Sequence, residues 1–254
     1  MKKEMYSSEV TLLRDTFRRL LRRHAKTNIV KLLDKTHPSD LALIFRYFND
    51  AEQDSIFSNM LPSEETVKFL YELDESIATR LIERETAERL AEIMQQASSN
   101  EQAFLMGLVS DEFASSVIDL LQAEEQEELE EMMAYPEDSA GILMYTDVFT
   151  LHEDTKAREA IYALQDQEDA EMVFYLYTLD DDGRLTGVIS LRDLVTTPSE
   201  TMLKDIMSKN IQAVRAETDQ EEVARIVSQY NFLAVPVVDA SEKLLGIVTV
   251  DSVV

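Results

Sequence analysis

The carboxylates are the residues of this chain best suited to chemistry. The sequence holds 50 Asp and Glu against 24 Lys and Arg, which gives a formal net charge of −26. Carboxylate and carbonyl oxygens are the protein ligands that Mg²⁺ and Ca²⁺ take. A body of this charge attracts cations and repels nucleic acid. We therefore expect cationic ligands and no DNA or RNA partner.

Other chemistries lack the residues that they need. The chain has no cysteine, which excludes disulfides and thiolate metal sites. Its three histidines, His24, His37 and His152, are scattered without metal-ligand spacing. The sequence also shows no glycine-rich phosphate loop and no nucleophile paired with a base. We expect a binding protein and not an enzyme.

One nine-residue phrase occurs twice in the chain. GVISLRDLV at 187–195 returns as GIVTVDSVV at 246–254. The Gly and the apolar residues predict a buried strand, and the Ser or Thr that follows predicts a turn into a helix. Weaker matches upstream, such as Leu143-Met144 with Ile206-Met207, extend the repeat. Residues 135–254 are therefore expected to contain one β-α-β-β-α unit used twice.

The preceding half of the chain has the pattern of short amphipathic helices. Helix-start signals recur about every two dozen residues, as in Pro38-Ser39-Asp40, Pro62-Ser63-Glu64 and Ser110-Asp111-Glu112. A pair of short helices cannot bury its apolar face alone, whereas stacked pairs share a continuous core. Residues 1–134 are therefore predicted to form a helical-repeat, superhelical domain, so the fold class is multidomain α and α+β.

Residues 8–34 are predicted to form a basic amphipathic helix. The expected apolar face contains Leu12, Leu13, Phe17, Leu20, Leu21 and Ile29, and the expected basic face contains Arg18, Arg19, Arg22, Arg23 and Lys26. Residues 1–36 hold ten basic and four acidic residues, whereas the remainder carries a net charge of −32. Two interpretations stay open. The helix caps the helical array, which we favour because terminal repeats are atypical, or it lies on an anionic membrane surface.

The repeated unit resembles a tandem pair of CBS domains, whose most recognisable segment is this Gly-apolar-apolar-Ser/Thr-x-x-Asp phrase. With the helical repeat in front, YPEDSAG at the joint and TDQEEVARI at 218–226, the chain is similar to the cytosolic part of an MgtE-type magnesium transporter. The resemblance implies a helical N-domain at 1–134, a first CBS domain at 135–200 and a second at 201–254. It also implies a membrane pore domain that this sequence does not include. We therefore expect an engineered, soluble fragment from the cytoplasmic face of the membrane.

The same resemblance implies Mg²⁺ ligands. These are the carbonyl of Gly141 with the carboxylate of Asp219 beside it, and the carboxylates of Glu221, Asp111 and Asp251. Ser115, Asn231 and Ser252 stand where the family is expected to have carboxylates. The alternative role for Asp219 and Asp111 is to cap a helix. Whether Mn²⁺ or Ca²⁺ competes stays open.

CBS pairs also commonly bind an adenine nucleotide, so the resemblance implies a second ligand, ATP or AMP. Asp193 would hold the ribose beside Ser190, Arg192 would contact phosphate, and Tyr175 and Phe232 would stack on adenine. The alternative is that both aromatic residues belong to the core. The second copy has Ser252 in place of the Asp, so it offers at most a weaker site.

Taken together, these features predict an Mg²⁺ sensor. Acidic domains repel one another, and Mg²⁺ binding would pull them together and so regulate the pore of the transporter. A homodimer through the CBS domains is expected. The alternatives are an adenine-nucleotide sensor and a passive interaction scaffold.

Overall fold

The computed structural model describes residues 2–167 and 173–253, and the chain divides into two compact units, Met1–Leu129 and Glu130–Val254. The first unit is helical, and the second contains two three-stranded sheets with helices. This confirms the predicted fold class, a helical N-terminal region followed by two β-α-β-β-α units. Among the described residues, no helix has both the length and the apolar character needed to cross a membrane.

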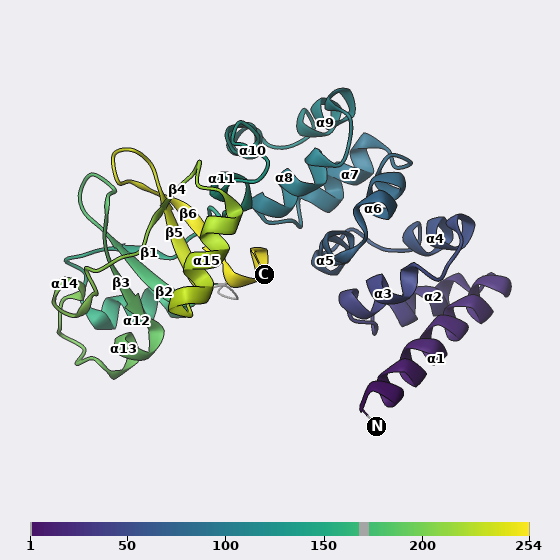
Figure 1. Ribbon diagram of the computed structural model, residues 1–254, viewed down its shortest axis with the longest axis horizontal. Coiled ribbons are helices and arrows are strands. Elements are labelled where there is room, and N and C mark those ends of the chain that lie inside the picture. Colours follow the sequence, from purple (N-terminus) through teal and green to yellow (C-terminus); the bar gives the residue numbers. More distant parts are fainter. Residues whose placement is uncertain (1, 168–172, 254) are drawn as a thin grey trace. The chain divides into compact units, whose positions relative to one another are not determined.

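The first unit contains the predicted pairs of short helices (Figure 1). They are α3 (Pro38–Phe45) with α4 (Asp50–Phe57), α5 (Glu64–Glu72) with α6 (Glu75–Ile82), α7 (Ala87–Met94) with α8 (Ser99–Gly107), and α9 (Asp111–Ile118) with α10 (Ala123–Met133). Several begin at the expected residues. Ser63 and Ser110 cap α5 and α9, since their side chains accept hydrogen bonds from Thr66 N and Phe113 N.

The core of this unit is formed by apolar residues of the paired helices. Phe45, Val67, Leu90 and Val117, one from the first helix of each pair, are fully buried. Phe45 also packs edge-on against Phe69, with ring centroids 4.9 Å apart. Burying each large apolar side chain contributes about 1.5–3 kcal/mol, and the shared core explains why helices of this length are stable together.

The N-terminal segment differs from its prediction. It forms two helices, α1 (Lys2–Arg22) and α2 (Lys26–Leu33), because the backbone turns at His24, which has a φ of 49°. Leu12, predicted on the apolar face, is 68% exposed. Phe17 is fully buried and packs against Phe48, with 6.3 Å between ring centroids. Helix α1 contacts α3 and α4, so its buried face covers the first helix pair.

The second unit contains two copies of the same sheet. In the first, β1 (Thr150–His152) lies parallel to β2 (Tyr175–Leu179), which is antiparallel to β3 (Leu185–Ser190). In the second, β4 (Val214–Arg215), β5 (Ala234–Val238) and β6 (Leu244–Thr249) repeat this order and these directions. The helices are α12 (Ala157–Gln165) and α13 (Leu191–Thr196) in the first copy, and α15 (Gln220–Tyr230) and the short 3-10 helix η2 (Val250–Ser252) in the second.

The two copies exchange the segments that precede their sheets. Helix α11 (Ala140–Leu143) precedes the first sheet in sequence, yet Ala140 N donates to Thr218 O (2.7 Å) and Tyr145 N donates to Ile247 O (2.7 Å) in the second copy. Helix α14 (Leu203–Ile206) precedes the second sheet, yet Leu203 N donates to Thr155 O (2.9 Å) in the first copy. Each copy therefore depends on a segment from the other side of the sequence repeat.

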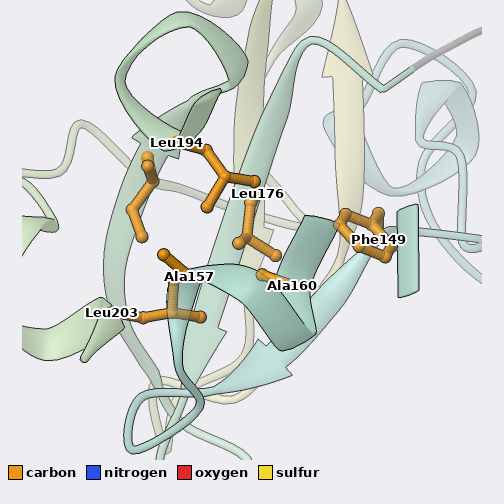
Figure 2. Packing of buried hydrophobic residues seen from close by; sticks show 7 residues of the cluster. Phe149, Ala157, Ala160, Leu176, Leu194 and Leu203 are labelled. Atoms are coloured by element: carbon orange, nitrogen blue, oxygen red, sulfur yellow. The ribbon is translucent and has the colours of Figure 1, made fainter. Parts of the chain in front are cut away.

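The core of the first copy shows the consequence of this exchange. Leu203 points into a cluster with Leu176, Leu194, Ala157 and Ala160 (Figure 2), and all five residues are fully buried. A second cluster joins the two sheets, since Tyr177 of β2 packs with Ala234 of β5 and Ile247 of β6. The two copies therefore form one packed body.

Candidate functional site

Two acidic segments meet at the start of the second unit. Gln220 N donates to Asp138 O (2.8 Å), Gln220 Nε2 donates to Asp138 Oδ1 (2.9 Å), and Gly141 N donates to Ala216 O (2.8 Å). These bonds bring the YPEDSAG segment beside the TDQEE segment. Three predicted metal residues, Gly141, Asp219 and Glu221, thus lie on adjoining stretches of chain.

Gly141 is required by its packing. A Cβ atom at this position would lie 2.4 Å from Cγ of the Tyr135 ring, so any larger residue would displace the ring. Burial raises the pKa of the Tyr135 hydroxyl, and the nearby negative charges of Glu217, Glu131 and Asp239 raise it further. Burial is the larger cause of the shift, and the three carboxylates add a negative potential around the Tyr135 side chain.

Asp219 caps a helix, which was the alternative to its predicted role as a metal ligand. Its Oδ1 accepts a hydrogen bond from Glu221 N (2.8 Å) at the N-terminus of α15. The residue is nevertheless exposed, and one carboxylate can accept from several partners, so a cap and an ion contact are compatible.

Sequence reasoning missed other carboxylates here. The exposed set, which we call the acidic junction, is Glu137, Asp138, Glu217, Asp219, Glu221 and Glu222. The high density of Asp and Glu in YPEDSAG and TDQEE indicated two acidic segments, but it did not show that these segments lie side by side.

Within residues 2–167 and 173–253, no three His, Asp or Glu side chains lie close enough together to hold a metal ion. Mg²⁺ retains several waters and uses only one or two protein carboxylates at many sites. The exposed carboxylates of the acidic junction attract cations by their charge.

The remaining two predicted metal residues lie elsewhere. Asp111 is in the first unit, at the first position of α9, where Ser110 is the cap. Ser115, in the place of an expected carboxylate, donates from Oγ to Asp111 O (2.8 Å). Asp251 is exposed in η2. Among the described residues of the second unit, no hydrogen bond or ion pair links Asp251 to the acidic junction.

Four predicted nucleotide residues gather at one end of the first sheet. Tyr175 pairs with Ser190 across β2 and β3, and α13 begins directly after Ser190. Ser190 Oγ donates to Asp193 Oδ2 (2.7 Å) and accepts from Asp193 N (3.1 Å). Arg192 is exposed beside them. This arrangement presents a carboxylate, a cation and an aromatic ring together.

The aromatic residues have protein partners. Tyr175 lies 6.3 Å from Tyr177, edge to face, whereas Phe232 stacks on Tyr230 at 5.4 Å. No ring contact between Tyr175 and Phe232 occurs among the described residues. Tyr177 is 1% exposed, its hydroxyl has no hydrogen-bond partner among the described residues, and burial raises its pKa.

The second copy has a different chemistry at the equivalent place. Buried Thr249 Oγ1 lies 3.1 Å from Ser252 Oγ, so a pair of hydroxyls stands where the first copy has a hydroxyl and a carboxylate. The carboxylate that pairs with Ser190 in the first copy is therefore replaced here by the neutral hydroxyl of Ser252.

Comparison with known proteins decides the family. The family model of the MgtE intracellular N domain matches residues 36–138, and the CBS domain model matches residues 140–200 and 203–254. The crystal structure of the cytosolic domain of the Mg²⁺ channel MgtE in complex with ATP is 31% identical, with a TM-score of 0.88. The match covers 94% of this chain and 98% of that chain. The chain belongs to the MgtE family. 

Further MgtE relatives agree with this assignment. The magnesium transporter MgtE of Thermus thermophilus is 33% identical over 88% of this chain, and that of Bacillus subtilis is 28% identical over 88%. The chain spans about half the length of these two transporters, 50% and 49% respectively. The CBS part alone also resembles part of an enzyme, the inosine-5'-monophosphate dehydrogenase of Methanocaldococcus jannaschii, at 26% identity over 43% of this chain. The MgtE resemblance predicted from the sequence is confirmed.

Proposed function

We propose that this chain is the Mg²⁺-sensing regulatory region of a magnesium transporter, acting at the cytoplasmic face of the membrane on a pore domain of the same full-length protein. The observation that carries the proposal is the acidic junction, where hydrogen bonds fix two segments of exposed carboxylates side by side. The absence of a catalytic constellation in the sequence supports a regulatory role over an enzymatic one.

The mechanism is electrostatic. At a net charge of −26 the chain repels itself, and bound Mg²⁺ offsets that repulsion. An ion at a concentration equal to its dissociation constant stabilises the bound state by about 0.4 kcal/mol per site, and five such sites contribute about 2 kcal/mol. That is enough to shift a balanced equilibrium toward a more compact state. In the transporter, compaction at high Mg²⁺ closes the pore.

Solution scattering with a matched pair of variants tests this mechanism. Asp219→Asn removes the charge but keeps an oxygen that can cap α15. Asp74→Asn is the control, because Asp74 Oδ1 caps α6 in the first unit by accepting from Ser76 N (3.1 Å). At constant ionic strength, millimolar Mg²⁺ is expected to reduce the radius of gyration of the wild type and of the control, and to reduce that of Asp219→Asn less. An unchanged wild-type radius would refute the proposal. Repeating the titration with Mn²⁺ and Ca²⁺ measures selectivity.

A homodimer through the CBS domains is part of the proposal. Its support is the exposure of large apolar side chains on the helices of both copies, with Tyr162 of α12 65% exposed and Val195 of α13 62% exposed. Tyr230 at the end of α15 is also 46% exposed. In the proposed dimer these side chains are covered by the partner protomer. Sedimentation equilibrium of the wild type and of Tyr162→Ser measures the dimer.

ATP or AMP is the second candidate ligand. The paired Ser190 and Asp193, with Arg192 and Tyr175 beside them, supply contacts for ribose, phosphate and adenine. The related MgtE cytosolic domain was crystallised with ATP. Asp193→Asn is expected to weaken ATP binding about tenfold or more in calorimetry, the cost of a hydrogen bond to a charged group. Asp205→Asn in α14 makes the same charge change and should bind ATP like the wild type. Equal affinities of all three proteins would remove Asp193 from the site.

A further inference from the structure

Exposed positive charge in this acidic chain is concentrated between the last turn of α1 and the turn after α2. Six basic residues form this basic face, namely Arg19, Arg22, Arg23, Lys26, Lys31 and Lys35, and all six are exposed. Leu12 and Arg19 are seven residues apart in α1, so they share one side of that helix, and Arg23 lies in the turn that follows it. Leu12 adds an apolar residue that is 68% exposed to the same side.

The fold does not use these six charges. Other arginines of α1 have partners in the protein: Arg14 pairs with Asp15 (2.9 Å), and Arg18 pairs with Glu52 (3.3 Å) and donates to Tyr47 O (2.5 Å). None of the six residues of the basic face has a side-chain hydrogen bond or an ion pair within the described parts of the chain. Their positive charges are therefore available to bind a partner.

We infer that the basic face binds an anionic phospholipid surface. The six charges extend from the last turn of α1 to the turn after α2 and are all exposed, so they form a charged stretch of surface and not a pocket. Such a shape suits an extended anionic surface, and Leu12 can enter the headgroup region. The acidic remainder of the chain does not cancel this attraction once it lies more than a Debye length, about 8–10 Å, from the membrane. The inference rests on these charges and not on the Mg²⁺ sites.

Vesicle co-sedimentation tests the inference on the whole chain. Each Lys or Arg near an anionic surface changes the partition coefficient about fivefold. The wild type is expected to bind vesicles of phosphatidylcholine and phosphatidylglycerol in equal parts, to bind less as NaCl rises, and not to bind vesicles of phosphatidylcholine alone. The triple variant Arg22→Gln, Arg23→Gln, Lys26→Gln should partition on the order of a hundredfold less.

The matched control changes the same number of charges elsewhere. Lys209, Arg225 and Lys243 are exposed residues of the second unit, and replacing all three by Gln gives the same net charge as the test variant. The control should bind like the wild type. Equal losses in both variants, or no binding of the wild type to the mixed vesicles, would overturn the inference. Binding of the basic face to single-stranded RNA that is tighter than its binding to the vesicles would also overturn the inference. Salt-sensitive self-association that persists without lipid and disappears in the test variant would overturn it as well.

Discussion

Gly187 and Gly246 occupy equivalent places in the repeated phrase, and each lies under a segment from outside its own sheet. A Cβ atom at Gly187 would lie 2.4 Å from Sδ of Met207, and one at Gly246 would lie 2.5 Å from the backbone oxygen of Tyr145. The two contacts are related by the exchange of α11 and α14. Glycine occurs at this position in both copies because a segment from outside the sheet packs against β3 at Gly187 and against β6 at Gly246.

Gly246→Ala should therefore destabilise the second unit. The atom in the way belongs to the backbone, which cannot rotate aside, so we expect a loss of about 1–3 kcal/mol, as for overpacked cores. Gly107→Ala is the control, since nothing lies within 4 Å of the added methyl group at the end of α8. There the change should be neutral or stabilising by up to about 1 kcal/mol. Urea unfolding followed by circular dichroism compares them, and equal midpoints would contradict the packing argument.

At the residue scale, local motifs were predictable and long-range partners were not. The Ser190–Asp193 pair is three residues apart, so its hydrogen bond belongs to the motif itself. Asp138 and Gln220 are paired across the sequence repeat, and neither residue has a local pattern that identifies the other. The acidic junction could be found only when the two segments were seen together.

At the element scale, the exchanged segments show the same limit. Strands and helices of the second unit were predicted from apolar runs and from the repeat, because these signals are local. The docking of α14 on the first copy depends on tertiary packing, since four helical residues carry little pattern of their own. The break at His24 was missed for a similar reason: the apolar periodicity continues across it while the backbone turns.

Leu203→Ala tests whether α14 completes the core of the first copy. Leu203 is fully buried among Leu176 and Leu194, so its truncation should cost about 2–5 kcal/mol. Hydrogen exchange should then accelerate in β2 and β3, although the mutated residue follows them in sequence. Leu233→Ala, at a residue that is 44% exposed, should change exchange little. Loss of protection confined to β4–β6 would show that α14 supports its own copy instead.

At the scale of the whole molecule, charge balance separates general repulsion from specific pairing. The sequence predicted the imbalance completely, because net charge is a sum over residues and needs no fold. The specific pairs needed the structure. Lys204 Nζ donates to Asp154 Oδ1 (2.7 Å) and lowers the pKa of Asp154, and the hydrogen bond from Lys156 lowers the pKa of Glu200. These pairs connect the start of α12 and the end of β1 to the segment around α14.

General self-repulsion and specific ion pairs predict different effects on stability. Self-repulsion makes the stability depend on salt, whereas the ion pairs make it depend on pH. At pH 7, raising NaCl from about 0.01 M to about 0.5 M should raise the melting temperature, because screening weakens self-repulsion. Near the isoelectric point of about 4.4 the salt effect should vanish, since the net charge is then close to zero.

A carboxylate with a lowered folded-state pKa stabilises the fold above its unfolded pKa, and that stability is lost as the pH falls through the folded value. The contributions of Asp154 and Glu200 should therefore disappear below about pH 4. Calorimetric scans of the wild type and of Asp154→Asn check this: their melting temperatures should differ at pH 7 and converge below pH 4. A difference that persists in acid would show that the Lys204 pair is not its source.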